Sequence, residues 1–458
     1  MKRLAQKTMF GFSIFAITLL VILFCLANFY QTNYAYDLGQ SYQYQLPYSK
    51  TVELKNQQCR LPKLAFPQKT AFLKITIQSS ILSYIFQPYI EIVAHNGRQK
   101  QYFEHGAHGV RYLNVSDFVG PSAVKLTLLG HFIHLKDQRA GLITYDKIPL
   151  ANANILIIAP HPDDAEIAAH GLYNQHKNAF VLTLTAGDGG KLLFQSFYNN
   201  DRLAYLNQGK LRTWNSITTP LAAGISSENV LNFGYLDGSL KAMYARRFVH
   251  RDPSNFNQAD INVFRKQNIS SYKNDLTAGA DWSSLIANLK SVIRKYQPTV
   301  IVTPYPAIDI HPDHQFSSVA VFQALQELNY QQGSLFLYSN HYPLSDYYPY
   351  GEMNSSVTLP PAVDGTVYFN SVYVHSLLAP QQKDKFLALE SMYALRSSTH
   401  EQNVANAFKT AFGIVKRKVL MQDLSYFRRA VRNHELFFVV PIKALSDSLV
   451  KKQLIGKH

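Results

Sequence analysis

The chain has 458 residues, of which 47% are hydrophobic and 16% charged, and its formal net charge is +15. This length and composition exclude a disordered chain and predict a globular protein of about two domains. The positive charge favours acidic partners. However, the basic residues are spread out and no nucleic-acid-binding motif occurs, so we expect no nucleic-acid partner. With only two cysteines, one of them (Cys25) inside an apolar segment, a structural disulfide framework is excluded.

The N-terminal segment has the pattern of a membrane anchor. Three basic residues lie among the first seven, and the apolar run at 9–29 is long enough to cross a bilayer as a helix. The next basic residue is Lys50, so the positive-inside rule leaves the N-terminus in the cytoplasm. We therefore predict a single transmembrane helix within residues 1–35, with the rest of the protein in the periplasm or at the cell surface. A cleaved signal peptide ending near Ala35 is the alternative.

Residues 36–150 contain short stretches in which apolar and polar side chains alternate. Leu73, Ile75 and Ile77, for example, are separated by polar residues. Such alternation, interrupted by Gly, Pro and Asn turns, predicts an antiparallel β-sandwich as an accessory domain. The aromatic residues of this part either fill the core or form a platform for sugar rings, and both interpretations stay open. They are Tyr84, Phe86, Tyr89, Tyr102, Phe103 and Tyr112.

From residue 151 onwards, strand-like and helix-like patterns alternate, which is typical of an α/β domain. Strands are expected at 154–159, 179–185, 229–233, 299–303 and 334–338, and helices at 164–176, 203–221, 282–296 and 312–328. Right-handed crossovers with the common strand order 3-2-1-4-5 place the first and fourth strands side by side. We predict a Rossmann-like, mostly parallel sheet for the domain formed by 151–458. The polar stretch 239–281, which contains Arg246, Arg247 and Arg251, is expected to be a functional loop or an insertion.

Two turns at strand ends combine imidazoles with carboxylates. One is His161-Pro-Asp-Asp164, and the other runs from Asp309 to His314 with the sequence Asp-Ile-His-Pro-Asp-His. The expected strand order brings these turns together at the switch point, where open α/β sheets bind ligands. On its own, the first turn is also explained as a helix cap, because Asp is a favoured N-cap residue. The presence of both turns favours one shared metal site.

The two motifs resemble the signature of the zinc-dependent N-acetylglucosaminyl deacetylases, the PIG-L/LmbE family. That family includes the phosphatidylinositol-glycan deacetylases and the mycothiol-pathway deacetylase. The resemblance covers about residues 151–400 and includes Gly187-Asp-Gly-Gly, Lys210-Leu-Arg212 and Gly234-Tyr-Leu-Asp237. Two positions differ from the family pattern. Ala165 stands where Glu is frequent, which leaves the metal chemistry intact, and Asn215 stands where an acidic residue often follows the arginine, which concerns the substrate site.

A catalytic zinc ion takes three nitrogen or oxygen ligands and leaves one position for water. His161, Asp164 and His314 provide such a set, and the resemblance implies the same three residues. The expected cofactor is Zn²⁺, with another divalent metal such as Fe²⁺ as the alternative.

The remaining residues of the two turns suit acid–base chemistry. Asp163, next to a ligand, is the expected general base, and His311 is expected to donate a hydrogen bond or a proton to the tetrahedral intermediate. Asp313 is expected to hold the imidazole of His311 in the required tautomer. Arg212 and Asp237 are the expected substrate-binding residues. The alternative for Arg212 is a solvated or salt-bridged helix residue.

The function predicted from these residues is metal-dependent removal of the N-acetyl group from an N-acetylglucosamine-type sugar. The expected substrate is a cell-envelope glycan or glycolipid, and the membrane is an expected partner through the N-terminal helix. Two alternatives remain. One is a glycan-binding envelope protein whose deacetylase-like domain is inactive. The other is a metallohydrolase that acts on an ester or on a non-sugar amide.

Overall fold

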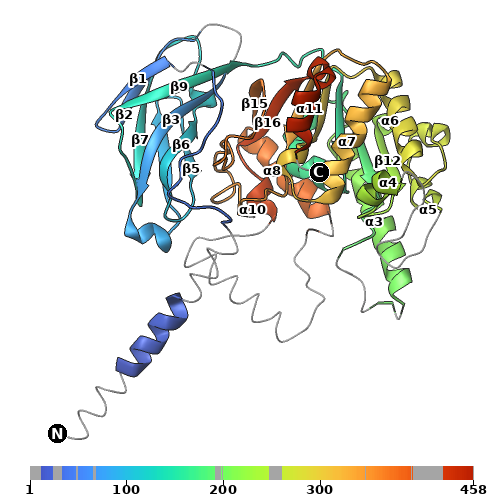
Figure 1. The fold of residues 1–458 in the computed structure, drawn as a ribbon, viewed down its shortest axis with the longest axis horizontal. Coiled ribbons are helices and arrows are strands. Elements are labelled where there is room, and N and C mark those ends of the chain that lie inside the picture. Colours follow the sequence, from blue (N-terminus) through green and yellow to red (C-terminus); the bar gives the residue numbers. More distant parts are fainter. Residues whose placement is uncertain are drawn as a thin grey trace, which may run out of the picture.

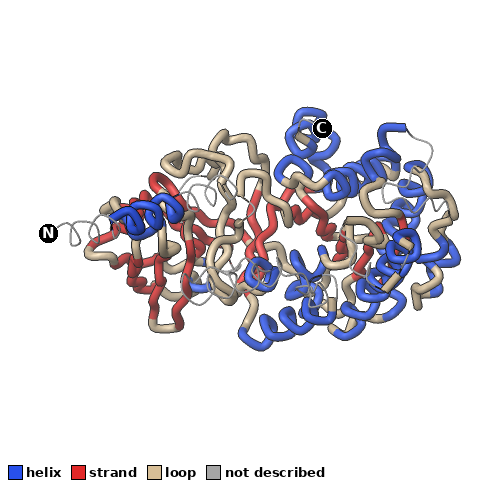
Figure 2. The backbone as a smooth tube through the Cα atoms, turned by 90° about the horizontal axis from the view of Figure 1, so that it is seen from below, coloured by secondary structure: helices blue, strands red, loops and turns tan. Residues whose placement is uncertain are grey.

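The strands of the protein form two sheets, which lie side by side in Figure 1. The computed structural model describes residues 12–23, 34–47, 50–64, 69–190, 197–198, 200–246, 260–345, 347–392, 395 and 426–456. The helices gather around the second sheet, whereas the first is flanked mainly by loops (Figure 2).

The first sheet is a single curled antiparallel sheet of nine strands, not the predicted β-sandwich. Its strands are β1 (Lys50–Lys55), β2 (Gln58–Leu61), β3 (Lys69–Ser79), β4 (Tyr89–Ala94), β5 (Gly97–Tyr102), β6 (His108–Asn114), β7 (Val124–His131), β8 (Ile133–Leu135) and β9 (Arg139–Asp146). The first four residues of β1 pair with β9 and the last two with β2, so one strand joins both halves into a continuous sheet. Alternation of polar and apolar residues shows only that one face is buried. It does not distinguish two packed sheets from one sheet curled around its own core.

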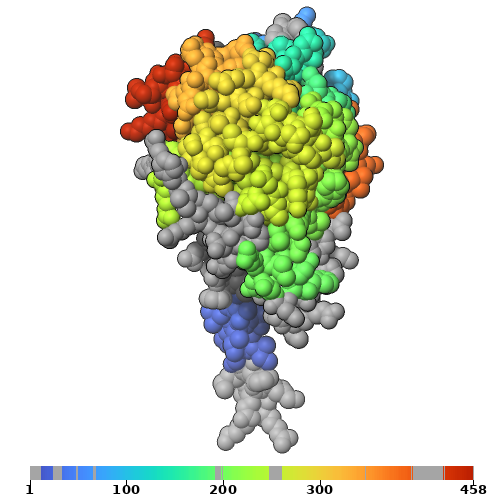
Figure 3. All heavy atoms as spheres, turned by 90° about the vertical axis from the view of Figure 1, so that its right-hand side faces the viewer, coloured from blue at the N-terminus to red at the C-terminus, as the bar shows by residue number. Residues whose placement is uncertain are grey.

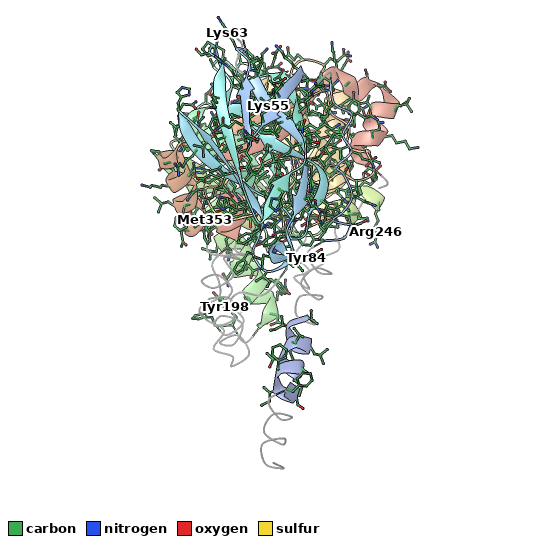
Figure 4. All side chains as sticks on the ribbon, turned by 90° about the vertical axis from the view of Figure 1, so that its left-hand side faces the viewer. Lys55, Lys63, Tyr84, Tyr198, Arg246 and Met353 are labelled. Atoms are coloured by element: carbon green, nitrogen blue, oxygen red, sulfur yellow. The ribbon has the colours of Figure 1, made fainter. Side chains whose placement is uncertain are left out.

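The aromatic residues of this first part divide between core and surface. Tyr102, Phe103 and Tyr112 are buried, in agreement with the core interpretation. Tyr84 and Phe86 are exposed at 42% and 36%, and Tyr84 lies at the lower end of the sheet in Figure 4.

The second sheet has seven strands in the order β12-β11-β10-β13-β14-β16-β15. They are β10 (Ile155–Ala159), β11 (Phe180–Thr185), β12 (Val230–Tyr235), β13 (Val300–Pro304), β14 (Ser334–Tyr338), β15 (Ser371–Ser376) and β16 (His434–Pro441). The five strands from β10 to β14 are parallel and follow the expected order 3-2-1-4-5. The predicted fold class is nevertheless wrong, because the antiparallel strands β15 and β16 extend the edge and make the sheet mixed. These two strands come from the chain after 338, where no strand was predicted.

Helices cover both faces of this sheet. They are α2 (Asp164–Gln175), α3 (Asp201–Ala222), α4 (Leu240–Arg246), α5 (Asn262–Arg265), α6 (Trp282–Tyr296), α7 (Pro312–Glu327), α8 (Ala379–Ser391), α10 (Tyr426–Ala430) and α11 (Ser448–Ile455). The Asp281 side chain caps α6 by accepting from the Ser284 N–H at 2.9 Å. Figure 3 shows the yellow part of the chain, which includes α6, covering one end of the molecule. The predicted polar insertion contains α4 and α5, which bury Met243 and Phe264. Arg246 is exposed, and Arg247 and Arg251 lie outside the described residues.

The predicted transmembrane helix is contradicted. Within the part of the chain that the structure describes, no helix is both long and apolar enough to cross a membrane. Residues 12–23 form a helix, and the remainder of the expected span lies outside the described residues. The membrane-anchored, extracytoplasmic location, which depended on this segment, is corrected with it.

The two sheets are joined by polar contacts. Asp117, between β6 and β7, accepts from Ser376 Oγ at 2.5 Å and from the Nε2 of His434 at 2.8 Å. Asn114, at the end of β6, donates to the Val357 carbonyl oxygen at 2.8 Å. The division at residue 150 falls between the last strand of one sheet and the first strand of the other, and the domain assignment stays a prediction.

A buried ion pair stabilises α2, the helix that follows β10. The helix is broken at Ala169, and Glu435 of β16 accepts the freed N–H groups of Gly171 and Leu172 at 2.7 and 2.9 Å. Lys385 of α8 donates to Glu435 at 2.7 Å and to the Ile167 carbonyl at 2.9 Å. Both charged side chains are 1% exposed. The carboxylate therefore acts as an internal N-cap whose charge is balanced by one lysine.

Replacing Lys385 with Met should lower the free energy of unfolding by about 3–5 kcal/mol, because the buried Glu435 carboxylate would lose its counter-charge. Urea unfolding followed by circular dichroism measures this change. Lys383→Met removes an exposed lysine from the same helix and should leave the midpoint almost unchanged. Equal midpoints for the two variants would contradict the role of the buried pair.

Candidate metal centre and active site

The two histidine–aspartate turns meet because β10 and β13 are adjacent parallel strands, with Ile157 paired to Val302. His161 lies two residues beyond the end of β10, and Asp164 is the first residue of α2. His314 lies in the first turn of α7, which follows β13. All three side chains are buried. The sequence-based expectation that the turns converge at the carboxyl edge of the sheet is thereby confirmed.

Three donor atoms at this edge form a nearly equilateral triangle. The Nδ1 of His161 lies 3.3 Å from the Nε2 of His314 and 3.3 Å from Oδ2 of Asp164, and the third side, from His314 Nε2 to Asp164 Oδ2, is 3.1 Å. Donors bound tetrahedrally to zinc at its usual ligand distances lie roughly 3.3 Å apart. The three predicted ligands therefore fit a divalent ion in both chemistry and spacing.

Carboxylates hold the outer nitrogen of each imidazole. The Nδ1 of His314 lies 3.0 Å from Asp309 Oδ2, and the Nε2 of His161 lies 3.2 Å from both Asp313 Oδ2 and Asp237 Oδ1. A carboxylate accepts the proton on that nitrogen and leaves the lone pair of the other nitrogen for a metal. Both tautomers are thus the ones that metal binding requires.

The carboxylate of Asp164 is oriented by a residue from a third strand end. Asn340, just beyond β14, donates from Nδ2 to Asp164 Oδ1 at 2.8 Å. Its own carbonyl oxygen accepts from Arg429 of α10 at 2.8 Å. Oδ1 is therefore occupied, whereas Oδ2 faces the two histidines and also accepts the His161 N–H at 2.9 Å.

The electrostatics of the cluster favour a cation. Burial alone would lower the pKa of His314, but Asp164 and Asp309 raise it to about 10. Burial would raise the pKa of Asp164, yet His314 and His161 hold it well below the usual value. Without a metal, the buried carboxylates thus keep protons on the imidazoles. A divalent ion would replace those protons.

The side chain of Asp163, the predicted base, contacts Arg212. Arg212 of α3 donates from Nη2 to Asp163 Oδ2 at 3.2 Å and from Nη1 to the Gly187 carbonyl oxygen at 3.0 Å. Burial raises the pKa of Asp163, and the Arg212 charge opposes that shift. Gly187 has φ +65°, and a Cβ there would lie 2.8 Å from the Arg212 guanidinium, so glycine is required for this approach.

The position of Arg212 agrees with the salt-bridged alternative for this residue. Its Nη1 also lies 3.8 Å from Asp237, whose other oxygen contacts His161. Substrate contact by Arg212 and Asp237 stays a prediction. Asn215, one turn further along α3, donates to the Ser391 carbonyl on α8 at 3.3 Å.

The ring of His311 stands against the metal-binding pair, with its centroid 4.7 Å from that of His161 and 5.1 Å from that of His314. Its Nδ1 accepts the Asp313 N–H at 3.3 Å, so a neutral ring carries its proton on Nε2. Burial and the charges of His161 and His314 lower the pKa of His311. The residue is therefore placed as a neutral hydrogen-bond donor.

The sequence had suggested that the side chain of Asp313 contacts His311. In the structure, this side chain has other partners. Its carboxylate accepts from the N–H groups of Gly238 at 2.6 Å and Leu240 at 3.1 Å and contacts His161. Only its backbone N–H reaches His311. Because Asp313 is one residue from His314 on a helix, its side chain leaves α7 in another direction and reaches the loop after β12.

Several residues of the site were missed from the sequence. Asp309 precedes His311 by two residues in the same strand-end turn, and this proximity was an available signal. Asn340 and His341 follow the carboxyl end of β14, where the switch-point argument also applies. Asp188, in the glycine-rich turn, accepts the Asp237 N–H at 2.9 Å and was identified only as part of a motif.

Other groups of side chains at this edge also satisfy the spacing of a metal site. One joins His161, His311 and His314, and another joins His161, Asp237 and Asp313. The second uses His161 Nε2 and requires Asp313, whose oxygens already accept two backbone N–H groups. We favour the triangle of His161, Asp164 and His314 because its three separations, 3.1–3.3 Å, match those of donors bound tetrahedrally to zinc.

The fold and the site together define an α/β unit with a candidate metal-binding centre at the switch point of its sheet. Residues 156–325 match the family model PIG-L, described as GlcNAc-PI de-N-acetylase. This match confirms the predicted resemblance over these residues. No match was found among curated proteins.

Solved structures with some similarity include the A40926 pseudoaglycone deacetylase Dbv21, at 18% identity and a TM-score of 0.34, over 63% of this chain and 98% of that chain. The zinc-inhibited form of teicoplanin deacetylase Orf2 has 19% identity and a TM-score of 0.34 over the same shares. GalB, the 4-carboxy-2-hydroxymuconate hydratase of Pseudomonas putida, has 13% identity and a TM-score of 0.31, over 63% of this chain and 96% of that chain. At these scores the likeness supports no argument about activity.

Replacing His314 with Ala should abolish stoichiometric binding of a divalent metal, because the triangle loses a ligand and Asp164 loses its partner at 3.1 Å. Metal content after dialysis, measured by plasma mass spectrometry, tests this. His95→Ala, at an exposed position of the first sheet, is the matched control and should keep full occupancy. Full occupancy in folded His314→Ala would rule out this assignment.

Proposed function

We propose that the protein is a metal-dependent deacetylase that hydrolyses the N-acetyl amide of an N-acetylated sugar. The observation that supports this most directly is the triangle of His161, Asp164 and His314 within a PIG-L family domain. The proposed metal is Zn²⁺, and Fe²⁺ would suit the same nitrogen and oxygen donors. When bound, such an ion polarises an amide carbonyl and lowers the pKa of a coordinated water to about 7.

In this proposal, Asp163 takes the proton of the attacking water. It directly precedes the ligand Asp164, and its side chain is 13% exposed. Arg212 donates to Oδ2, and no described residue donates to Oδ1, which remains available to a water molecule. A carboxylate with one oxygen fixed by a cation and the other directed to water has the arrangement of a general base.

His311 would act on the other side of the reacting amide. A neutral imidazole with its proton on Nε2 can hydrogen-bond the oxygen that becomes negatively charged in the tetrahedral intermediate. Asp313 would orient His161 instead of His311, which revises the role expected from the sequence. Asp309 would orient His314 in the same way.

The acceptor is proposed to be an N-acetylhexosamine, because the matched family is described as a GlcNAc-PI de-N-acetylase. Asp237, with a side chain 14% exposed at the rim of the cluster, is the proposed partner of sugar hydroxyls, and Arg212 the proposed partner of an anionic group. The envelope setting and the membrane partner depended on the N-terminal anchor and are not carried further.

The reaction is tested by incubating metal-loaded protein with N-acetylglucosamine-containing saccharides and measuring acetate enzymatically and the product amine by mass spectrometry. The expected result is one free amine for each acetate released. A chelator should stop the reaction, and adding the divalent metal back should restore it. Acetate released from O-acetylated saccharides, without any sugar amine, would instead support the alternative of an esterase. Metal binding without turnover on any N-acetylated sugar would favour an inactive domain or a non-sugar amide substrate.

Asp163→Asn should lower turnover by roughly 10²–10⁴, because the amide keeps the size of the carboxylate but does not accept a proton. Metal content should stay at the wild-type level, since Asp163 is not one of the three ligands. Steady-state acetate release and metal analysis on the same sample separate these effects. Near-normal turnover with metal present would mean that another group, such as Glu166, is the base.

A further inference from the structure

A second cleft lies between the two sheets, and it faces away from the metal centre. It has a volume of about 670 Å³, and its wall includes Leu150 and Ala151, which precede β10, and His176, which follows α2. The metal ligands follow the other end of β10 and begin α2. The cleft is therefore at the amino edge of the second sheet, whereas the metal centre is at the carboxyl edge. In Figure 1, the chain passes between the two sheets near this edge, from β9 to β10.

The cleft contains an ammonium group without a counter-charge. Lys147, just after β9, is half-buried, and its Nζ lies 5.7 Å from the ring centroid of Tyr373 of β15. No carboxylate of the described residues lies within ion-pair distance of it. Lys69, the other lysine in the wall, is paired with Asp146. Removing an ammonium from water without pairing it is unfavourable, so this position is suited to an anion.

The acidic side chain in the wall of the cleft does not fill that role. Asp117 lines the cleft, but its two oxygens already accept from Ser376 and His434. Burial lowers the pKa of Lys147, and the charge of Asp117 opposes that shift only in part. The attraction between these two groups is therefore too weak to compensate for burial.

The same wall holds an imidazole nitrogen without a hydrogen-bond partner. His375 of β15 is 6% exposed, and its Nε2 has no partner among the described residues. Burial lowers the pKa of His375 to about 4, so the ring is neutral at physiological pH. The ring of His176 lies 6.4 Å from it, centroid to centroid, and burial lowers the pKa of His176 as well. A neutral imidazole is satisfied by a hydroxyl group, which can donate or accept.

We propose that this cleft binds an acidic sugar, with an oxyanion paired to Lys147 and a hydroxyl group hydrogen-bonded to His375. The cleft has the volume typical of small-ligand sites and lies at a junction between two structural units, where such sites are frequent. Neither group alone defines the ligand. An unpaired ammonium favours negative charge, a neutral imidazole can hydrogen-bond a hydroxyl group, and a sugar acid or sugar phosphate offers both. The site is separate from the metal centre and does not depend on the proposed deacetylation.

The oxyanion of the bound sugar is either a carboxylate or a phosphate, and two anionic sugars used as probes distinguish these cases. Metal-free protein is titrated in a calorimeter with glucuronate, with glucose 6-phosphate and with neutral glucose. Wild-type protein should bind at least one of the two anionic sugars at millimolar concentration and bind glucose much more weakly. The anion that binds identifies the source.

Variants locate the site. Lys147→Met should weaken binding of the anionic sugar by about tenfold or more, because a charge-assisted hydrogen bond is lost. Lys147→Arg keeps the charge and should retain binding, which separates loss of charge from misfolding. Lys125→Met, on the exposed side of β7, is the matched control and should bind as the wild type does. Unchanged affinity in Lys147→Met, equal affinity for glucose, or no binding of either anion by wild-type protein would overturn the proposal.

Discussion

The site depends on the pairing of β10 with β13. Two buried parallel strands, about 145 residues apart in the sequence, exchange hydrogen bonds with Ile157 opposite Val302, so the turns after both strands end at one edge. The contacts among the three predicted ligands follow from that adjacency. His161 and Asp164 come from one turn and His311 and His314 from the other, and Asn340 arrives from β14, the next strand. Because parallel strands all end at the same edge, one hydrogen-bonding pattern positions residues from three separate segments.

Around these ligands the chain buries more carboxylates than basic side chains. Asp163, Asp164, Asp237, Asp309 and Asp313 surround two imidazoles, and Arg212 is the one guanidinium that contacts them among the described residues. Each carboxylate has a defined donor, so the excess charge is held in place and is not solvated. Such an arrangement costs stability unless a cation occupies it, which is the usual relation between a pre-organised metal site and its ion. The Glu435–Lys385 pair shows the contrasting case, in which a buried carboxylate is balanced within the chain itself.

The first sheet makes polar contacts with the second part of the chain. Its contacts with the second part of the chain pass through Asp117, Asn114 and Tyr36, whose hydroxyl lies 3.1 Å from that of Tyr350. Tyr36 and Tyr42 each donate to the buried carboxylate of Glu104 at 2.6 Å. Arg111 balances the charge of Glu104 at 3.0 Å. This packing leaves a cleft at the edge opposite the metal, lined by Lys147, which follows β9, and His375 of β15. The junction thus provides a second polar surface.

The sequence by itself determined the five parallel strands, their order and the convergence of the two histidine–aspartate turns. Those inferences depend on local periodicity and on the fixed handedness of crossovers, which need no knowledge of side-chain packing. The family resemblance was also recognisable in the sequence, because each motif consists of a few consecutive residues. Three features required the tertiary structure. Whether alternating strands form two sheets or one curled sheet depends on how β1 pairs at both ends, and alternation is the same in either case. Whether Asp313 orients His311 or His161 depends on the direction in which its side chain leaves α7. The roles of Asn340, Glu435 and Lys147 depend on neighbours that are distant in the sequence, which no local pattern encodes.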